Sequence, residues 1–233
     1  MKVGLLAAMD KEVALLLPLM ENLSETALGS VKAYAGKISG HDVCVMKCGI
    51  GKVNSALNAY RMIEVFNPDL LINSGVAGGA DASMKVGSVL VATEAAYHDV
   101  WCGPGTEWGQ IDGMPARFSM SDCVVETCRN IEGASGFRFG LIATGDRFIS
   151  TVADLEHIKN VYPEALACDM ESASIAQVCH MLGVPLAVLR VVSDTPGQAD
   201  NIAQYKDFWN EAPARSFSLI SSLLKALDDC KRL

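Results

Sequence analysis

The sequence is poor in aromatic residues and has no excess of positive charge. Of its 233 residues, 6% are aromatic and 20% are charged, and the formal net charge is -8. An acidic chain repels both the phosphate backbone of nucleic acids and anionic lipid surfaces. The composition therefore argues against nucleic acid or a membrane as the main partner.

Long uncharged apolar runs are also missing. The N-terminal run VGLLAAM is broken by Asp10, Lys11 and Glu12, and no small-residue cleavage site follows it. No uncharged segment reaches the roughly 18 residues that a membrane helix needs. We therefore expect a cytoplasmic protein with neither a signal peptide nor a membrane span.

The spacings typical of metal and disulfide sites are absent as well. The eight cysteines form no CxxC pair, and the four histidines form no HxxxH or HExxH pair. Several cysteines lie within apolar strand or helix patterns, where a thiol acts as a small hydrophobic group. We expect reduced cysteines and no metal site.

What the sequence does contain is a regular alternation of apolar strands and helices. Strands are expected at residues 2–8, 69–75, 86–95, 137–145 and 185–194, with a hairpin at 32–49 that turns at Ser39 to Asp42. Helices are expected at 10–20, 51–66, 151–160 and 170–182, and from Tyr205 onward with a bend at Pro213. The strands are apolar on both faces, which is typical of a sheet covered by helices on both sides. We predict one α/β domain, residues 1–233, with a mixed, mostly parallel central sheet.

In such folds ligands bind beyond the carboxyl ends of the strands, and several charged residues follow strands here. Glu12, Glu171 and Asp194 each lie where an apolar element ends, and Arg190 lies within the last strand. Structural interpretations also exist: a helix N-cap for Asp169, a first-turn helix acid for its neighbour Glu171, and a turn residue for Asp194. Their joint occurrence at separate strand ends favours a site.

Glycine-rich loops follow two of the expected strands. The segments GIGKVN and GVAGGAD contain neither the full dinucleotide fingerprint G-x-G-x-x-G nor the phosphate loop G-x-x-x-x-G-K-[ST]. Binding of a nucleotide phosphate is therefore poorly supported. The glycines are better suited to bringing the backbone close to a small, largely uncharged ligand, or simply to making tight turns.

Six ordered motifs together resemble one enzyme family. They are AAMDKEV, CGIGKVN, NSGVAGGAD, TGDRFI, DMESASIAQVCH and RVVSD. In order and spacing they are similar to the bacterial 5′-methylthioadenosine/S-adenosylhomocysteine nucleosidases, over about residues 1 to 208. The resemblance implies a nucleoside phosphorylase-like fold. It also implies an N-glycosyl hydrolase that releases adenine from 5′-modified adenine nucleosides without a cofactor.

The resemblance also assigns roles to single residues. Glu12 would activate the attacking water, Asp194 would protonate the purine with Ser193 fixing its position, Glu171 would bind the ribose hydroxyls, and Arg190 would hold the water and the carboxylates. Phe148 would stack on adenine and the backbone of Ile149 would read its edge. The remaining pocket residues would be Met9, Ile50, Val76, Ala77, Gly78, Met170 and Tyr205.

These residue types suit the chemistry of glycosidic cleavage. Positive charge builds on the ribose and negative charge on the departing purine, so an acid is wanted at the purine and anionic groups near the sugar. One carboxylate suffices as the base that delivers water. Glu171 is thus interpreted as the ribose ligand, and Asp169 as a structural cap of the helix that presents it.

Two other functions remain open from the sequence. Nucleoside phosphorylases share the fold but need a phosphate cradle of arginine and backbone donors, and where they commonly carry an arginine this chain has Asn73. A non-catalytic nucleoside-binding module would have lost Glu12 or Asp194, and both are present. Hydrolysis by water is favoured over both.

The segment from Val100 to Pro115 departs from the family pattern. It contains Trp101 and Trp108 and is rich in Gly and Pro. The resemblance implies a homodimer, and such a segment is better ordered against a partner than alone in water. We expect it to close the 5′ end of the neighbour's pocket, with Trp101 shaping the choice of 5′ substituent; a surface loop is the alternative.

Overall fold

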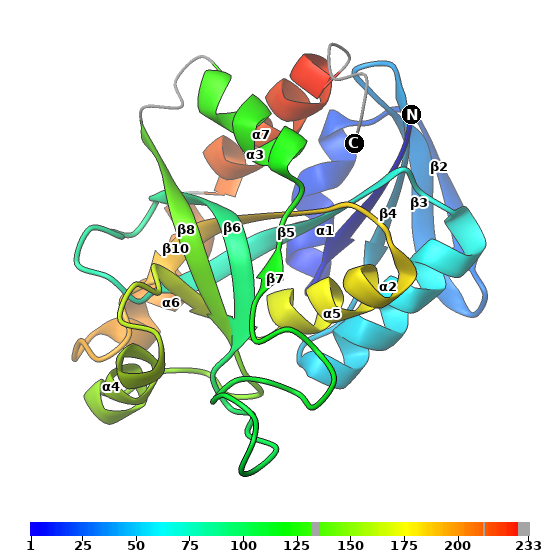
Figure 1. The fold of residues 1–233 in the computed structure, drawn as a ribbon. Helices are drawn as coiled ribbons and strands as arrows, with labels where there is room; N and C mark the ends of the chain where they lie inside the picture. Colours follow the sequence, from blue (N-terminus) through cyan, green and yellow to red (C-terminus); the bar gives the residue numbers. More distant parts are fainter. Residues whose placement is uncertain (132–135, 212, 228–233) are drawn as a thin grey trace.

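A ten-stranded mixed sheet forms the centre of the molecule (Figure 1). The structure is a computed structural model and describes residues 1–131, 136–211 and 213–227. The strands are β1 (Lys2–Ala7), β2 (Glu21–Leu28), β3 (Val31–Ile38), β4 (His41–Lys47), β5 (Leu70–Gly79), β6 (Val89–Tyr97), β7 (Phe118–Ser119), β8 (Phe137–Thr144), β9 (Ala167–Asp169) and β10 (Leu186–Asp194).

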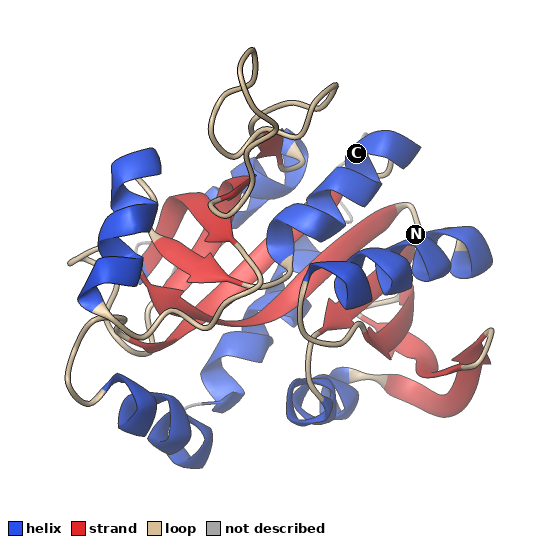
Figure 2. Cartoon of the chain, turned by 90° about the horizontal axis from the view of Figure 1, so that it is seen from below, coloured by secondary structure: helices blue, strands red, loops and turns tan. Residues whose placement is uncertain are grey.

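Helices lie on both faces of this sheet, as Figure 2 shows. They are α1 (Asp10–Leu16), α2 (Lys52–Phe66), α3 (Asp122–Asn130), α4 (Val152–Val161), α5 (Ser172–Leu182), α6 (Asn201–Glu211) and α7 (Pro213–Leu227), with a 3-10 turn η1 (Leu17–Leu19). Helices α2 and α5 pack together on one face, while α7 contacts both α1 and α3 on the other (Figure 1). The α/β fold with a mixed sheet predicted from the sequence is confirmed.

The central strands of the sheet pair in parallel, and five of its strands form a closed ring. Strands β4, β1, β5 and β10 are joined by parallel pairings, and the antiparallel strands β2 and β3 extend one edge. At the other side, β10 pairs with β6, β6 with β8, β8 with β9, and β9 returns to β5. This ring of five strands brings Asp194, Gly78 and Cys168 to one place, because Gly78 pairs with both of the others.

Alternating side chains of the central strands build the core on both faces. In β1, Leu6 packs into the cluster under α2 and α5, whereas Leu5 packs into the cluster under α1, α3 and α7. Met46 and Val45 of β4 divide in the same way. Strands of this kind are apolar throughout, which is why their sequence pattern predicts a sheet covered on both sides.

Several elements differ from the sequence-based expectation. The helix expected at 10–20 ends at Leu16, and a 3-10 turn takes over at Leu17, since Pro18 provides no N–H for a continuing α-helix. The helix expected at 170–182 begins only at Ser172. Strands β2, β7 and β9 and helix α3 were not predicted; β2 is exposed along nearly its whole length, so it has no apolar alternation to reveal it.

The cysteines are free thiols at positions 44, 48, 102, 128, 168 and 179. For Cys123 the expectation of a reduced thiol was wrong, because this residue is disulfide-bonded. Cys123 lies on α3. The spacing of cysteines along the sequence does not reveal which of them the fold brings together.

The extent of the domain, residues 1–233, stays a prediction, as does the cytoplasmic location. Among the described residues, none of the helices combines the length and the apolarity that a membrane crossing demands. The C-terminal segment is helical as expected, with α6 ending at Glu211 and α7 starting at Pro213.

Candidate active site

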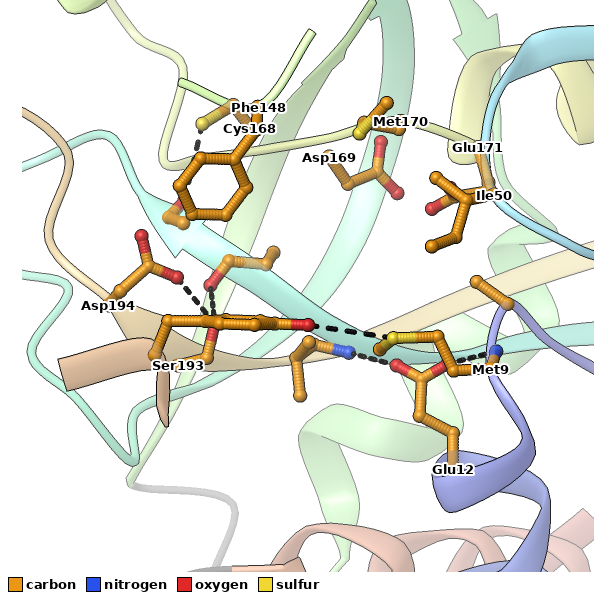
Figure 3. Close-up of a pocket in the computed structure, with 15 residues that line it drawn as sticks. Met9, Glu12, Ile50, Phe148, Cys168, Asp169, Met170, Glu171, Ser193 and Asp194 are labelled. Atoms are coloured by element: carbon orange, nitrogen blue, oxygen red, sulfur yellow. Dashed lines mark hydrogen bonds between the residues drawn. The ribbon is translucent and has the colours of Figure 1, made fainter. Parts of the chain in front are cut away.

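A cavity opens where β1, β5, β9 and β10 end, and most of the residues expected at a site line it (Figure 3). Its lining residues are Ala8, Met9, Glu12, Ile50, Val76, Ala77, Gly78, Phe148, Cys168, Asp169, Met170, Glu171, Ser193, Asp194 and Tyr205. The elements that carry them are far apart in sequence, so only the folded sheet brings them together. In Figure 3 Asp194 lies at one side of the cavity, and Glu12 and Glu171 lie at the other.

Glu12 is held at the start of α1 by two backbone donors. One carboxylate oxygen accepts a hydrogen bond from Met9 N–H at 2.9 Å, and the other accepts one from Val76 N–H at 3.1 Å. The side chain is buried, and burial raises the pKa of Glu12, against the opposing effect of the Arg190 charge and these backbone donors. A carboxyl group with a raised pKa is suited to accept a proton near neutral pH.

Gly75 leaves room for the Glu12 carboxylate. A Cβ at this position would lie 2.7 Å from Glu12 Oε1. A similar approach explains Gly78, where a Cβ would lie 2.8 Å from the ring of Pro196. Gly75 and Gly78 therefore let side chains of this chain approach the backbone closely. The close approach of a ligand, expected from the sequence, stays a prediction.

Asp194, the last residue of β10, is buried and accepts hydrogen bonds on both oxygens. Ser193 Oγ donates to Oδ1 at 2.6 Å, and the Asn201 side-chain amide donates to Oδ2. Burial raises the pKa of Asp194, and these two donors act in the opposite direction. The role expected for Ser193, fixing Asp194, agrees with this contact. Asn201 was not predicted, because six residues of irregular chain separate it from Asp194.

Glu171 lies at the junction of β9 and α5, as the N-cap residue of that helix. Its Oε1 accepts a hydrogen bond from Gly51 N–H at 3.0 Å. Burial, with a further contribution from the charge of Asp169, raises the pKa of Glu171 to about 7. Among the described residues, no donor contacts its second oxygen, which leaves that oxygen to a ligand.

Asp169 and Arg190 form a buried ion pair beside these two glutamates. Arg190 donates to Asp169 Oδ2 from Nε at 3.1 Å and from Nη2 at 2.8 Å. Asp169 also accepts from Thr144 Oγ1 at 2.6 Å and from Ser172 N–H at 3.1 Å. The contact with Ser172, in the first turn of α5, agrees with the expected structural role of Asp169, although the N-cap position itself belongs to Glu171.

Arg190 lies behind the cavity wall rather than in it. Its guanidinium also donates to the side chain and to the backbone carbonyl of Asn73, and to Ser172 Oγ. Asn73 therefore holds the guanidinium of Arg190 in place. The only sign of this role in the sequence is a polar amide within an otherwise apolar strand.

Aromatic residues form the open side of the cavity. Phe148 and Tyr205 meet edge to face, with ring centroids 5.6 Å apart, and Tyr205 OH contacts Met9 Sδ at 3.5 Å. Phe148 is 45% exposed, which leaves a flat apolar face for a ligand ring. Ile149 lines a smaller adjoining cavity together with Phe148 and Asp194.

Trp101 lies apart from the lining residues of this chain's cavity. It is 54% exposed and stacks on Trp108, with ring centroids 6.0 Å apart. Its expected role concerned the pocket of a neighbouring subunit and stays a prediction.

A cluster of charged residues ties two cavity loops together. Lys52 Nζ binds both oxygens of Asp99 at 2.8 and 2.9 Å, and Lys52 N–H donates to Asp146 Oδ1 at 2.7 Å. Asp146 N–H in turn donates to Asp99 at 2.9 Å. These bonds fix the loop that carries Gly51 against the loop that carries Phe148. Within the part of the chain that the structure describes, no group of three or more His, Cys, Asp or Glu is arranged to hold a metal ion.

The sequence profile of the phosphorylase superfamily matches residues 2–225 of this chain. This match defines the class to which the fold and the cavity belong.

More closely related proteins narrow the class. A 5′-methylthioadenosine/S-adenosylhomocysteine nucleosidase of Geobacillus sp. is 36% identical over 97% of this chain and 99% of its own length. A protein of the same name from Staphylococcus haemolyticus is 38% identical over 97% of this chain and all of its own length. The structure of the Streptococcus pneumoniae nucleosidase with a transition-state inhibitor superposes with a TM-score of 0.93, at 36% identity, over 98% of this chain and 100% of that one. The chain therefore belongs to the 5′-methylthioadenosine/S-adenosylhomocysteine nucleosidase family, as the sequence motifs indicated.

The raised pKa of Glu171 predicts a specific dependence of stability on pH. A carboxyl group whose pKa is about 7 when folded and 4.5 in its unperturbed state stabilises the fold below pH 4.5, and this contribution is lost as the pH rises through 7. Glu171→Gln removes the titration. We compare the free energy of unfolding of the variant with that of the parent at each pH. The difference, variant minus parent, should be ~1 to 3 kcal/mol larger at pH 8 than at pH 4.5.

Urea unfolding of both proteins at the two pH values measures this difference. Glu126→Gln, on the exposed surface of α3, is the control and should leave the pH dependence unchanged. Parallel pH curves for the parent and Glu171→Gln would show that Glu171 has an ordinary pKa.

Proposed function

We propose that the protein hydrolyses the N-glycosidic bond of 5′-substituted adenine nucleosides, with 5′-methylthioadenosine and S-adenosylhomocysteine as the substrates, and releases adenine and the 5-substituted ribose. One observation carries the proposal: a buried acid, Asp194, faces two further buried acids, Glu12 and Glu171, across a cavity with an aromatic wall (Figure 3). The names of the relatives support the same reaction.

Asp194 is proposed as the acid at the purine. Its raised pKa favours the protonated form, which can donate to a ring nitrogen as electrons move onto the departing base. Phe148, whose ring lies on the same side of the cavity in Figure 3, stacks on the purine. The backbone of Ile149 reads the purine edge, as expected from the sequence.

Glu12 and Glu171 are proposed to act at the sugar. Glu12 accepts a proton from water and directs the resulting nucleophile to the anomeric carbon, while the free oxygen of Glu171 binds the ribose hydroxyls. The negative charge at this end also stabilises the positive charge that develops on the ribose. Met9, Ile50 and Met170 supply apolar contacts around the sugar and its 5′ substituent, with Tyr205 closing over them.

Water is favoured over phosphate as the nucleophile. The residues that line the cavity include neither lysine nor arginine among those described. Arg190, which lies behind the cavity wall, already donates to Asp169, Asn73 and Ser172. A phosphate dianion would therefore lack the charged donors that such sites need.

Product analysis tests the reaction. Incubation with 5′-methylthioadenosine should give free adenine and 5-methylthioribose at the same rate with and without inorganic phosphate. A ribose 1-phosphate product would support a phosphorylase, and tight binding without adenine release would support a binding module.

Two variants test the assignment of the acid and the base. Glu12→Gln and Asp194→Asn should each lower turnover by at least ~10²-fold, the usual effect of removing a general base or acid. Both replacements conserve shape, so circular dichroism should show a folded protein. Turnover within a few-fold of the parent in either variant would remove that residue from the mechanism.

We further propose that the chain forms a homodimer through α2. Val53, Leu57 and Tyr60 are 78, 54 and 48% exposed and recur at the spacing that places them on one helix face. This stripe starts next to Ile50, a cavity residue that is itself half exposed. An exposed apolar stripe that continues into the site suits an interface that completes the site.

Charge placed on this stripe should separate the subunits. Leu57→Glu should shift the mass measured by light scattering from dimer to monomer and reduce activity in parallel. Val65→Glu, on the same helix but off the stripe and 56% exposed, is the matched control and should remain dimeric. A fully active monomer would contradict the shared site.

The loop that carries Trp101 is proposed to close the 5′ end of the partner's pocket. Trp101→Ala should then change the ranking of 5′ substituents more than it changes cleavage of 5′-deoxyadenosine. An unchanged ranking would leave Trp101 as a surface residue.

A further inference from the structure

The carboxyl group of Asp194 depends on a contact from another element, the first residue of α6. Asn201 is 2% exposed, and its side-chain nitrogen donates to Asp194 Oδ2. The amide oxygen of Asn201 has no hydrogen-bond partner among the described residues. The contact with Asp194 is therefore what orients this buried amide.

The two donors on Asp194 differ in what they can do. The Ser193 hydroxyl lies 2.6 Å from Oδ1 and 3.3 Å from the carbonyl oxygen of Ala77. It can donate to an ionised Asp194, or accept from a protonated one while donating to Ala77. The amide nitrogen of Asn201 can only donate a hydrogen bond, so this bond is stronger when Asp194 is negatively charged.

Negative charge develops on Asp194 during the proposed reaction, when its proton moves to the purine. Asp194 is 2% exposed, so bulk water solvates its carboxylate little and fixed donors must stabilise the charge. We propose that Asn201 is a positioning residue for catalysis, which holds Asp194 and stabilises the carboxylate that forms as the purine is protonated. The inference rests on the proposed role of Asp194.

Helix α6 also carries other contacts to the site, and these provide the control. Gln204 Oε1 accepts a hydrogen bond from Thr195 N–H at 2.8 Å, one residue beyond Asp194. Tyr205 lies one residue further, over the cavity. Gln204→Ala therefore weakens the docking of α6 near Asp194 but leaves both donors on its carboxylate in place.

Other charged or titratable groups face Asp194 and must stay constant in the comparison. They are Cys168 of β9, Tyr205 of α6, and Arg147 and Asp169, which line the small cavity that adjoins Asp194. Neither Asn201 nor Gln204 replacements alter any of them, so a change in the pH profile reports on the Asn201 contact.

The test compares Asn201→Ala, the isosteric Asn201→Asp, Gln204→Ala and Asp194→Asn with the parent, using full pH profiles of kcat and KM for adenine release. Loss of a hydrogen bond to a charged group should lower kcat of Asn201→Ala by about 10- to 100-fold. KM should change little, because Asn201 does not line the cavity.

The alkaline limb of the profile is the second readout. Activity requires protonated Asp194, and loss of a donor that favours the ionised form raises its pKa. The limb should therefore move to higher pH in Asn201→Ala, and further in Asn201→Asp, where a second carboxyl group replaces the donor. Gln204→Ala should keep the parental limb.

Each outcome decides. Parental kcat and an unmoved limb in both Asn201 variants, with Asp194→Asn inactive, would overturn the role of Asn201 and leave the proposed function intact. An equal shift in Gln204→Ala would assign the effect to docking of α6 and would also overturn it. Activity retained by Asp194→Asn would instead contradict the proposed acid itself, and this inference with it.

Discussion

The buried ion pair of Arg190 with Asp169 is the interaction on which the site depends. It joins β10 to the end of β9, and through Asn73 it reaches β5 as well. Three carboxylates, those of Glu12, Asp169 and Glu171, lie near one another, and all three residues are buried. A single guanidinium supplies the compensating charge, and the pKa of Glu12 and of Glu171 would be raised further without it.

The neighbouring acids Asp169 and Glu171 have different proposed roles, one structural and one toward the ligand. Asp169 has all its hydrogen-bonding capacity engaged by Arg190, Thr144 and Ser172, so it holds the structure together. Glu171, two residues later, has one backbone donor and an oxygen to spare. The raised pKa values of Glu171 and Asp194 show that burial disfavours their charged forms relative to water. Such a cost in stability is common at active sites.

Much of this could be predicted from the sequence, and for identifiable reasons. Strands buried on both faces are recognisable as apolar runs. Most of the residues that the motifs around Glu12, Glu171 and Asp194 assigned to a site line one cavity, while their roles stay predictions. The exposed strand β2 has no such pattern, and the three residues of β9 are too few to carry one. Contacts made by the three-dimensional arrangement alone could not be predicted: the amide of Asn201 on Asp194, and Asn73 as the anchor of Arg190.

A double-mutant cycle on Arg190 and Asp169 tests the central claim most directly. Arg190→Met and Asp169→Asn should each lower the free energy of unfolding by about 3 to 5 kcal/mol, because each leaves a buried partner uncompensated. The double variant should lose at least about 2 kcal/mol less than the sum of the two single losses. Urea unfolding at pH 7 measures all four proteins. Losses that add to within about 0.5 kcal/mol would contradict the account, since the two residues would then stabilise the fold independently.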